Sequence, residues 1–330
     1  MSKRMLGKLS FLVGGTFGGT FGVFIGYYLN KPREVKEWSP GSSYMINLPS
    51  KEKQWLPQVL APFGGYPGPV HDALPRKAYY SSFNRRLHHP NWVFEHLTKD
   101  SLKIGEGVDR KFSKFREDSD IPEMFNAKLT DYIRSGYDRG HMAPAADAKN
   151  TQESLDETFY LTNIAPQVGN GFNRDYWAFL EEFCRKLVLK EHFKDVYIFT
   201  GPAYLPKKEE DGKWYVKYQL IGEPPNVAVP THFFKVILAV KENDSGKLHA
   251  LGCFLLPNQP IPHNDPLENY AVPLNALERT TGLRFFENLK EETVPLCEAT
   301  KCELIPPHKW ISSDEREKLL TDQEPKKLIS

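Results

Sequence analysis

The stretch GFNRDYWAFLEEFCRKLVLKEHF, residues 171–193, carries the clearest helical pattern in the chain. Its apolar side chains recur at helical spacing, at Phe172, Tyr176, Phe179, Leu180, Phe183, Leu187 and Val188. This spacing predicts a helix over about residues 172–190 with one apolar face turned toward a core.

A second row of side chains runs along the same predicted helix. Asn173, Trp177, Glu181 and Arg185 are spaced by four residues, so they lie beside the apolar face. Polar groups in such a row can form the wall of a site. The alternative is an ordinary solvated face on which Glu181 and Arg185 form an ion pair.

Aromatic and β-branched runs surround this helix and predict strands. They lie at residues 91–97, 158–166, 195–204, 214–222, 231–240 and 248–257. A second helix is predicted within residues 273–289. Many strands with one long helix set among them indicate an α+β fold.

Composition excludes a disordered chain. The 330 residues are 40% hydrophobic and 13% aromatic, which is enough for a sizeable core. The formal net charge of +1 excludes long-range attraction of the whole molecule to a polyanion. Any affinity for nucleic acid must therefore come from a local patch.

The four cysteines do not form a zinc or redox motif, because no pair has C-x-x-C spacing. Free thiols are the default expectation. Only Cys297 and Cys302 are close enough in sequence to invite a bridge.

The amino terminus predicts a membrane anchor at residues 1–30. Lys3, Arg4 and Lys8 precede an uncharged run from Ser10 to Asn30 that is long enough to cross a bilayer as a helix. Glycines recur every fourth residue in this run. A cleaved mitochondrial presequence is the competing interpretation. We favour an uncleaved anchor that also acts as the targeting signal.

Composition shifts divide the rest of the chain. Residues 31–64 are rich in proline, glycine and serine and predict a flexible linker. Residues 65–307 form the predicted folded domain. Residues 308–330 read as a charged tail with little apolar content to bury.

The segment YDRGHMAPAAD, Tyr137 to Asp147, places an acid, an arginine and a histidine side by side. Histidine can exchange a proton near neutral pH, and arginine suits phosphate oxygens. The combination points to phosphate chemistry. The alternative is a surface turn in which Asp138 caps a backbone amide.

Four motifs follow one another in order: DRGH at 138–141, TNIAPQ with Asn163, FNRDYW with Asn173, and LEEFCRKL with Glu181 and Arg185. GYPGPVHD precedes them and ERTTGLRFF follows them. The succession resembles the sugar-non-specific DNA/RNA endonucleases with a ββα-metal (His-Me finger) site, in the mitochondrial endonuclease G branch and of fungal type. The resemblance covers about residues 65–304 and implies a mainly antiparallel sheet with a long site helix.

The resemblance also implies roles for individual residues. His141 matches the general base, and Asn173 matches the only direct protein ligand of one Mg²⁺ or Mn²⁺ ion. Glu181 matches the acceptor that holds metal-bound waters.

Further residues complete the implied site. Arg139 and Arg185 match phosphate clamps, and an upstream arginine is expected, with Arg110 favoured over Arg116. Asn163 matches a partner of the scissile phosphate, with a strand-end cap as the alternative. Asp138 is expected to orient the loop through backbone amides and not to bind metal.

The implied activity is hydrolysis of DNA and RNA with little sequence preference, leaving a 5′-phosphate. The resemblance further implies a homodimer held at the mitochondrial inner membrane by residues 10–30, with the nuclease domain in the intermembrane space. The alternative function is a membrane-anchored phosphodiesterase that acts on small nucleotides or lipids.

Overall fold

A computed structural model describes residues 60–243, 246–306 and 310–321. The predicted anchor at residues 10–30 lies outside these ranges, as does most of the predicted linker. Within the described ranges, no helix has the length and apolar character needed to span a bilayer.

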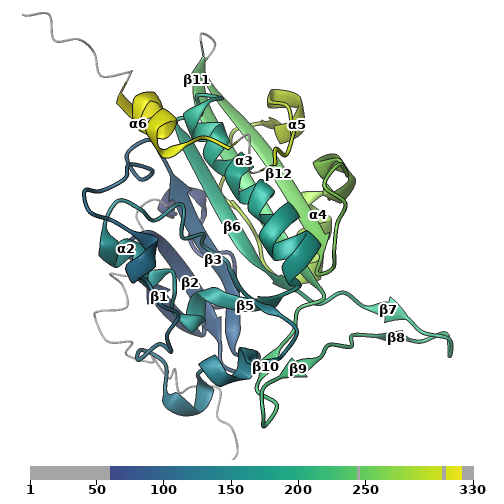
Figure 1. Cartoon of the computed structure of the whole chain (residues 1–330). Helices are drawn as coiled ribbons and strands as arrows, with labels where there is room; N and C mark the ends of the chain where they lie inside the picture. The colour runs from purple at the N-terminus through teal and green to yellow at the C-terminus, as the bar shows by residue number, and fades with distance from the viewer. Residues whose placement is uncertain (1–59, 244–245, 307–309, 322–330) are drawn as a thin grey trace, which may run out of the picture. The chain divides into compact units, whose positions relative to one another are not determined.

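The core of the fold is one seven-stranded sheet in the order β1-β2-β3-β6-β11-β12-β13 (Figure 1). All neighbours are antiparallel except β12 and β13. The strands are β1 (Asp72–Pro75), β2 (Tyr79–Asn84), β3 (His89–Leu97), β6 (Asp195–Ala203), β11 (His232–Asn243), β12 (Gly246–Pro257) and β13 (Thr293–Pro295). The predicted strands at 91–97, 195–204, 231–240 and 248–257 are confirmed as β3, β6, β11 and β12.

The long predicted helix is confirmed as α3 (Trp177–Leu189), preceded by the π-helical segment η7 (Gly169–Tyr176). Figure 1 shows α3 lying across one face of the sheet. Its buried residues, including Leu180 and Leu187, share a core with Phe233 and Ile237 of β11. This apolar contact holds the polar row of the helix at a fixed distance from the sheet.

A second core covers the opposite face of the sheet. Phe199, Phe234, Phe285 and Phe286 meet there with α4 (Leu274–Thr281). The helix predicted within residues 273–289 is shorter than expected, because Gly282 takes a left-handed conformation, φ +70°, and ends it.

The site itself is built on a small ββα unit. Strand β4 (Asp138–His141) pairs antiparallel with β5 (Ile164–Gln167), and η7 and α3 follow. DRGH is thus a strand and not a surface turn. The predicted strand at 158–166 is correct only from Ile164, because η6 (Leu161–Asn163) is a 3-10 turn.

The predicted strand at 214–222 is interrupted. It contains only β8 (Trp214–Tyr215), which pairs with β7 (Lys207–Lys208), and β9 (Leu220–Ile221), which pairs with β10 (Val227–Ala228). The remaining elements are η2 (Ala61–Phe63), η3 (Arg110–Phe112), η4 (Glu123–Phe125), η5 (Leu129–Tyr132), α2 (Gln152–Glu157), η8 (Leu267–Tyr270), α5 (Leu296–Ala299) and α6 (Ser313–Thr321).

Both predicted edges of the folded domain need correction. Leu60 is fully buried in the second core, so the body begins before residue 65. At the other end, Ile311, Leu319 and Leu320 of the predicted charged tail pack against the first core. Residues 310–321 are therefore part of the folded body.

The cysteines follow the default expectation only in part. Cys184 and Cys253 are free and buried, whereas Cys297 and Cys302 form a disulfide. The bridge closes the short segment that begins with α5, and Cys302 lies in the first core.

Candidate active site

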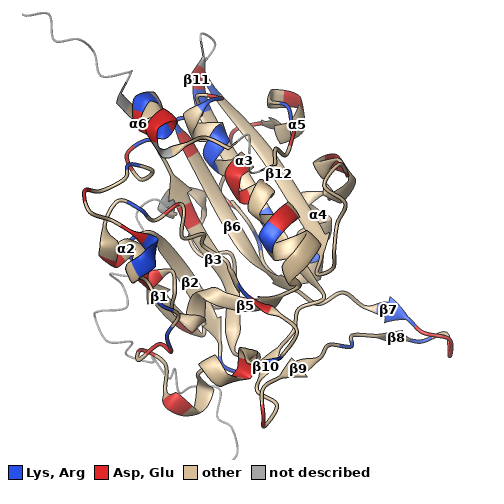
Figure 2. Cartoon of the chain, in the orientation of Figure 1, with Lys and Arg blue, Asp and Glu red and all other residues tan. Residues whose placement is uncertain are grey.

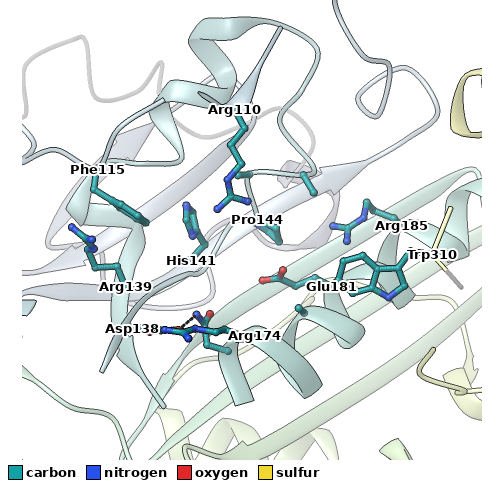
Figure 3. A pocket seen from close by; sticks show the side chains of 14 residues that line it. Arg110, Phe115, Asp138, Arg139, His141, Pro144, Arg174, Glu181, Arg185 and Trp310 are labelled. Atoms are coloured by element: carbon teal, nitrogen blue, oxygen red, sulfur yellow. Dashed lines mark hydrogen bonds and ion pairs between the residues drawn. The ribbon is translucent and has the colours of Figure 1, made fainter. Parts of the chain in front are cut away.

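A cavity of about 450 Å³ opens beside the amino-terminal half of α3 (Figure 3). Its walls come from the turn around Arg110 and Phe115, from β4, from the loop at 144–146, from η7 with α3, and from Trp310. Of the residues predicted for the site, Arg110, Arg139, His141, Asn173, Glu181 and Arg185 all line it. Segments far apart in the sequence thus meet here.

His141 is placed by the pairing of β4 with β5, where it faces Ile164. Gly140, beside it, faces Ala165, and a Cβ atom at Gly140 would lie 2.0 Å from Gln167 Oε1. A side chain at this position would therefore clash with the buried side chain of Gln167, and glycine avoids the clash. The His141 ring packs against Phe115 and Phe159, with ring centroids 5.3 and 4.9 Å away.

The two ring nitrogens of His141 differ in surroundings. Nε2 is buried and has no hydrogen-bond partner among the described residues. Nδ1 also has no hydrogen-bond partner among the described residues, yet it is not among the buried atoms that lack one, so it is the nitrogen exposed to the cavity. A neutral imidazole has one N–H, so Nδ1 can accept a proton when Nε2 carries the hydrogen.

Burial, together with the charges of Arg110 and Arg139, lowers the pKa of His141 to about 3. The ring is therefore neutral at physiological pH. A neutral imidazole with an unpaired nitrogen can take a proton from water.

Arg110 and Arg139 bring positive charge to the cavity without acidic partners in the described part of the chain. Arg139 lies over the Phe115 ring at 4.4 Å, and Arg110 lies over the Phe159 ring at 5.5 Å. Such guanidinium groups are available to a phosphate. Arg116, the less favoured alternative, lies over Tyr160 at 4.3 Å and does not line the cavity.

Asp138 orients the amide of Asn173. The Asn173 Nδ2 atom donates to Asp138 Oδ2 at 2.9 Å, so the amide oxygen is left for the cavity. Arg174 Nε and Nη2 also donate to this carboxylate, at 2.7 and 2.6 Å. The prediction that Asp138 binds backbone amides is wrong, because in the described residues its carboxylate accepts hydrogen bonds from these two side chains. Burial opposes ionisation of Asp138, but hydrogen bonds from Arg174 and Asn173 outweigh it and lower the pKa.

Glu181 lies two turns further along the helix and lines the same cavity. Burial raises the pKa of Glu181 to about 7, although Lys235 and Arg185 favour the charged form. Together with the Asn173 oxygen, it supplies hard oxygen atoms on one wall. Figure 2 shows an acidic band on α3 that is followed, further along the helix, by a basic band.

Arg185 was expected to clamp phosphate, but its guanidinium is bound by two acids of the protein. Its Nη1 donates to Asp147 Oδ1 at 2.6 Å, and its Nε donates to Glu182 Oε2 at 2.8 Å. All three residues are buried, and no ion pair joins Arg185 to Glu181 in the described structure. The charge of Arg185 is thus compensated, unlike that of Arg110 and Arg139.

Asn163 does not reach the cavity, which corrects its expected contact with phosphate. The residue is 0% exposed. Its Oδ1 accepts from Ala143 N, and its Nδ2 donates to the carbonyls of Ala143 and Thr158, each at 2.9 Å. Asn163 therefore fixes the loop that follows His141.

The donor set fits a hard divalent ion that keeps most of its waters. Mg²⁺ prefers oxygen ligands and gives up water reluctantly, which suits one amide oxygen with a nearby carboxylate. No group of three or more His, Cys, Asp or Glu residues able to hold a metal occurs in the described ranges.

Among the lining residues that were not predicted from the sequence, Arg174 and Trp310 carry the largest polar or aromatic groups. Arg174 stands next to Asn173 inside the FNRDYW motif, and its neighbour relation to Asn173 was the available signal. No sequence pattern indicated Trp310, because it lies in a segment that was expected to remain outside the folded domain.

Comparisons with known proteins agree with this geometry. Residues 64–292 match the model of the DNA/RNA non-specific endonuclease family. The chain is 51% identical to the mitochondrial nuclease of Saccharomyces cerevisiae over 73% of this chain and 74% of that one. It is 54% identical to nuclease C1 of Cunninghamella echinulata over 72% and 92% of the two chains. The crystal structure of the EndoG/EndoGI complex, which describes inhibition of EndoG, matches with a TM-score of 0.65 and 44% identity, covering 74% of this chain and 94% of that one.

Proposed function

The chain belongs to the family of DNA/RNA non-specific endonucleases, and from this premise we propose that it is a mitochondrial endonuclease that cuts DNA and RNA and leaves 5′-phosphate ends. The observation that carries the proposal is the neutral His141, with an unpaired nitrogen, between two guanidinium groups that form no ion pair among the described residues. The matched family and relatives are nucleases, so the comparisons give no support to a phosphodiesterase for small nucleotides or lipids.

The side chains divide the reaction among them. Arg110 and Arg139 bind oxygens of the scissile phosphate and hold it beside His141. Nδ1 of His141 accepts a proton from the attacking water. No covalent bond to the enzyme is needed, because water itself is the nucleophile.

Asn173 and Glu181 would hold one Mg²⁺ or Mn²⁺ ion, Asn173 through its oxygen and Glu181 through bound waters. Such an ion supplies charge stabilisation to the departing 3′-oxygen. Asp138 keeps the Asn173 oxygen directed at the cavity, as its hydrogen bond to Nδ2 requires.

The lack of base specificity follows from the charged side chains that line the cavity. The charged groups described above suit phosphate and metal, and phosphate contacts carry no sequence information directly. DNA and RNA should therefore both be cut.

Digestion of a supercoiled plasmid and of a long RNA by the full chain tests this function. We expect cleavage with Mg²⁺ or Mn²⁺, none with EDTA, and 5′-phosphates on the products. His141→Ala should slow cleavage strongly, while His192→Ala, at an exposed histidine beyond α3, serves as the matched control. Rapid hydrolysis of a dinucleotide analogue with both polymers left intact would support the phosphodiesterase instead.

Location and assembly are further parts of the proposal. We place the protein at the mitochondrial inner membrane, anchored by residues 10–30, as a homodimer with its nuclease domain in the intermembrane space. The basic start and the uncharged run support the anchor. Carbonate extraction, protease protection of mitoplasts and cross-linking in mitochondria test the three statements; a soluble matrix monomer would contradict them.

A further inference from the structure

The carboxyl-terminal segment contributes a wall to the active site although it lies beyond residues 64–292, the region matched by the family model. Trp310 lines the cavity together with His141 and Glu181. Its indole N–H donates to the carbonyl of Ile305 at 2.8 Å. Its ring also meets Phe179 edge to face, with centroids 6.2 Å apart. The orientation of the indole is therefore fixed.

The residues after Trp310 fasten this segment to both sides of the cavity. Ile311 N donates to Glu182 Oε1 on α3 at 3.3 Å. Arg316, which is buried, donates to the carbonyls of Leu102 and Ala146 at 3.0 and 3.1 Å. Ala146 belongs to the loop that lines the cavity. The segment thus ties the metal-binding wall to the loop that follows His141.

The position of Trp310 relative to the charged groups indicates which part of the substrate it contacts. In Figure 3 the indole lies at the end of the cavity opposite Phe115 and Arg139, with His141 and Glu181 between them. A phosphate held beside His141 carries a nucleoside on each side. One of these nucleosides would extend toward Trp310.

The indole is suited to stacking and not to reading a base. Its one hydrogen-bond donor is already used by Ile305, so it offers only its aromatic surface. Stacking on an aromatic side chain tolerates any base, because every base has a π-face. This agrees with an enzyme that lacks sequence preference.

We propose that Trp310 is a substrate-binding residue that stacks on the base next to the scissile phosphate, so that the carboxyl-terminal segment is part of the active site. The proposal rests on the proposed nuclease function. Loss of one stacked base on alanine substitution reduces binding by roughly 5- to 150-fold in proteins that bind single strands.

The test compares cleavage of two oligonucleotides by the full-length protein. One is an ordinary single strand, and the other carries abasic residues on both sides of a single cleavable phosphate. Trp310→Ala should raise KM for the ordinary strand by roughly 5- to 150-fold and leave KM for the abasic strand unchanged. Trp310→Phe should keep much of the binding, whereas Trp310→Leu, which fills space without an aromatic ring, should not.

Several outcomes would overturn the proposal. An equal loss on both strands would show that Trp310 only supports the fold, and no loss on either would show that it does not bind substrate. The phenylalanine and leucine variants decide the matter if the alanine variant is unstable. Trp214→Ala, at a tryptophan that is 67% exposed on β8, controls for loss of an indole away from the cavity. If the wild-type protein cleaves no nucleic acid, the proposed function itself fails.

Discussion

Removing the Asp138 carboxylate should weaken metal binding while leaving the general base in place. Asp138 holds the Asn173 amide through one hydrogen bond of 2.9 Å and otherwise binds Arg174, whose side chain is 61% exposed. An exposed ion pair contributes little to stability, so Asp138→Ala should fold normally. Loss of a group that orients a metal ligand typically lowers metal affinity by roughly 10- to 100-fold. The Mg²⁺ concentration for half-maximal cleavage should rise by that factor.

Two variants separate orientation of Asn173 from the charge of Arg174. Arg174→Ala leaves the bond between Asp138 and Asn173 intact, so its metal dependence should match the wild type. In the double variant Asp138→Ala/Arg174→Ala, metal binding should remain weak if the lost orientation of Asn173 is the cause. It should recover if the cause is repulsion of the ion by an unpaired Arg174. Asp211→Ala, at an exposed acid paired with Tyr215, is the remote control.

The assay is single-turnover cleavage of a labelled duplex across a Mg²⁺ titration, with direct Mn²⁺ binding measured by calorimetry. Saturating metal should restore most of the rate in Asp138→Ala, because His141 and its neighbours are unchanged. The reasoning is refuted if the titration curve of Asp138→Ala superimposes on that of the wild type. A loss that saturating metal does not recover would also refute it.

Three further predictions follow from the same contacts. His141→Ala should lose roughly 10²- to 10⁴-fold in single-turnover rate, without rescue by excess metal and with an unchanged circular dichroism spectrum. Arg110→Ala should weaken binding of a labelled oligonucleotide in fluorescence anisotropy, whereas Arg116→Ala should not, because only Arg110 lines the cavity. The pKa of His141 is about 3 in the folded protein and about 6.5 in the unfolded chain. Between these two pH values the unfolded chain binds a proton at this ring and the folded protein does not. The free energy of unfolding should therefore fall as pH drops through this window. Urea denaturation at pH 7 and pH 5 should show a smaller fall in His141→Ala.

The long elements were predictable because each carries its own pattern. The helix α3 and the strands β6, β11 and β12 contain enough apolar residues at one period to indicate their type. The four residues of β4 carry no such pattern, since DRGH is polar. They become a strand only by pairing with β5.

The sequence motifs predicted which residues line the cavity more accurately than they predicted the binding partners of each residue. Arg185 was expected to bind phosphate, with an ion pair to Glu181 as the alternative, yet Asp147 and Glu182 bind it. Asp147 is 38 positions earlier in the chain, so helical spacing alone could not indicate it. Asn163 is similar, because the carbonyl and amide of Ala143 that hold it become neighbours only when the loop closes.

Asn173 and His141, the two central side chains of the site, are held in a similar way that neither sequence motif indicates. Each polar group is fixed on one side and left unpaired on the other. Asn173 donates through Nδ2 to Asp138, which leaves its oxygen open. His141 is gripped by the rings of Phe115 and Phe159, which leaves its nitrogens without partners among the described residues. A buried polar atom without a hydrogen-bond partner lowers stability by about 1–3 kcal/mol. The unpaired Nε2 therefore lowers stability, while Nδ1 stays neutral and open to the cavity.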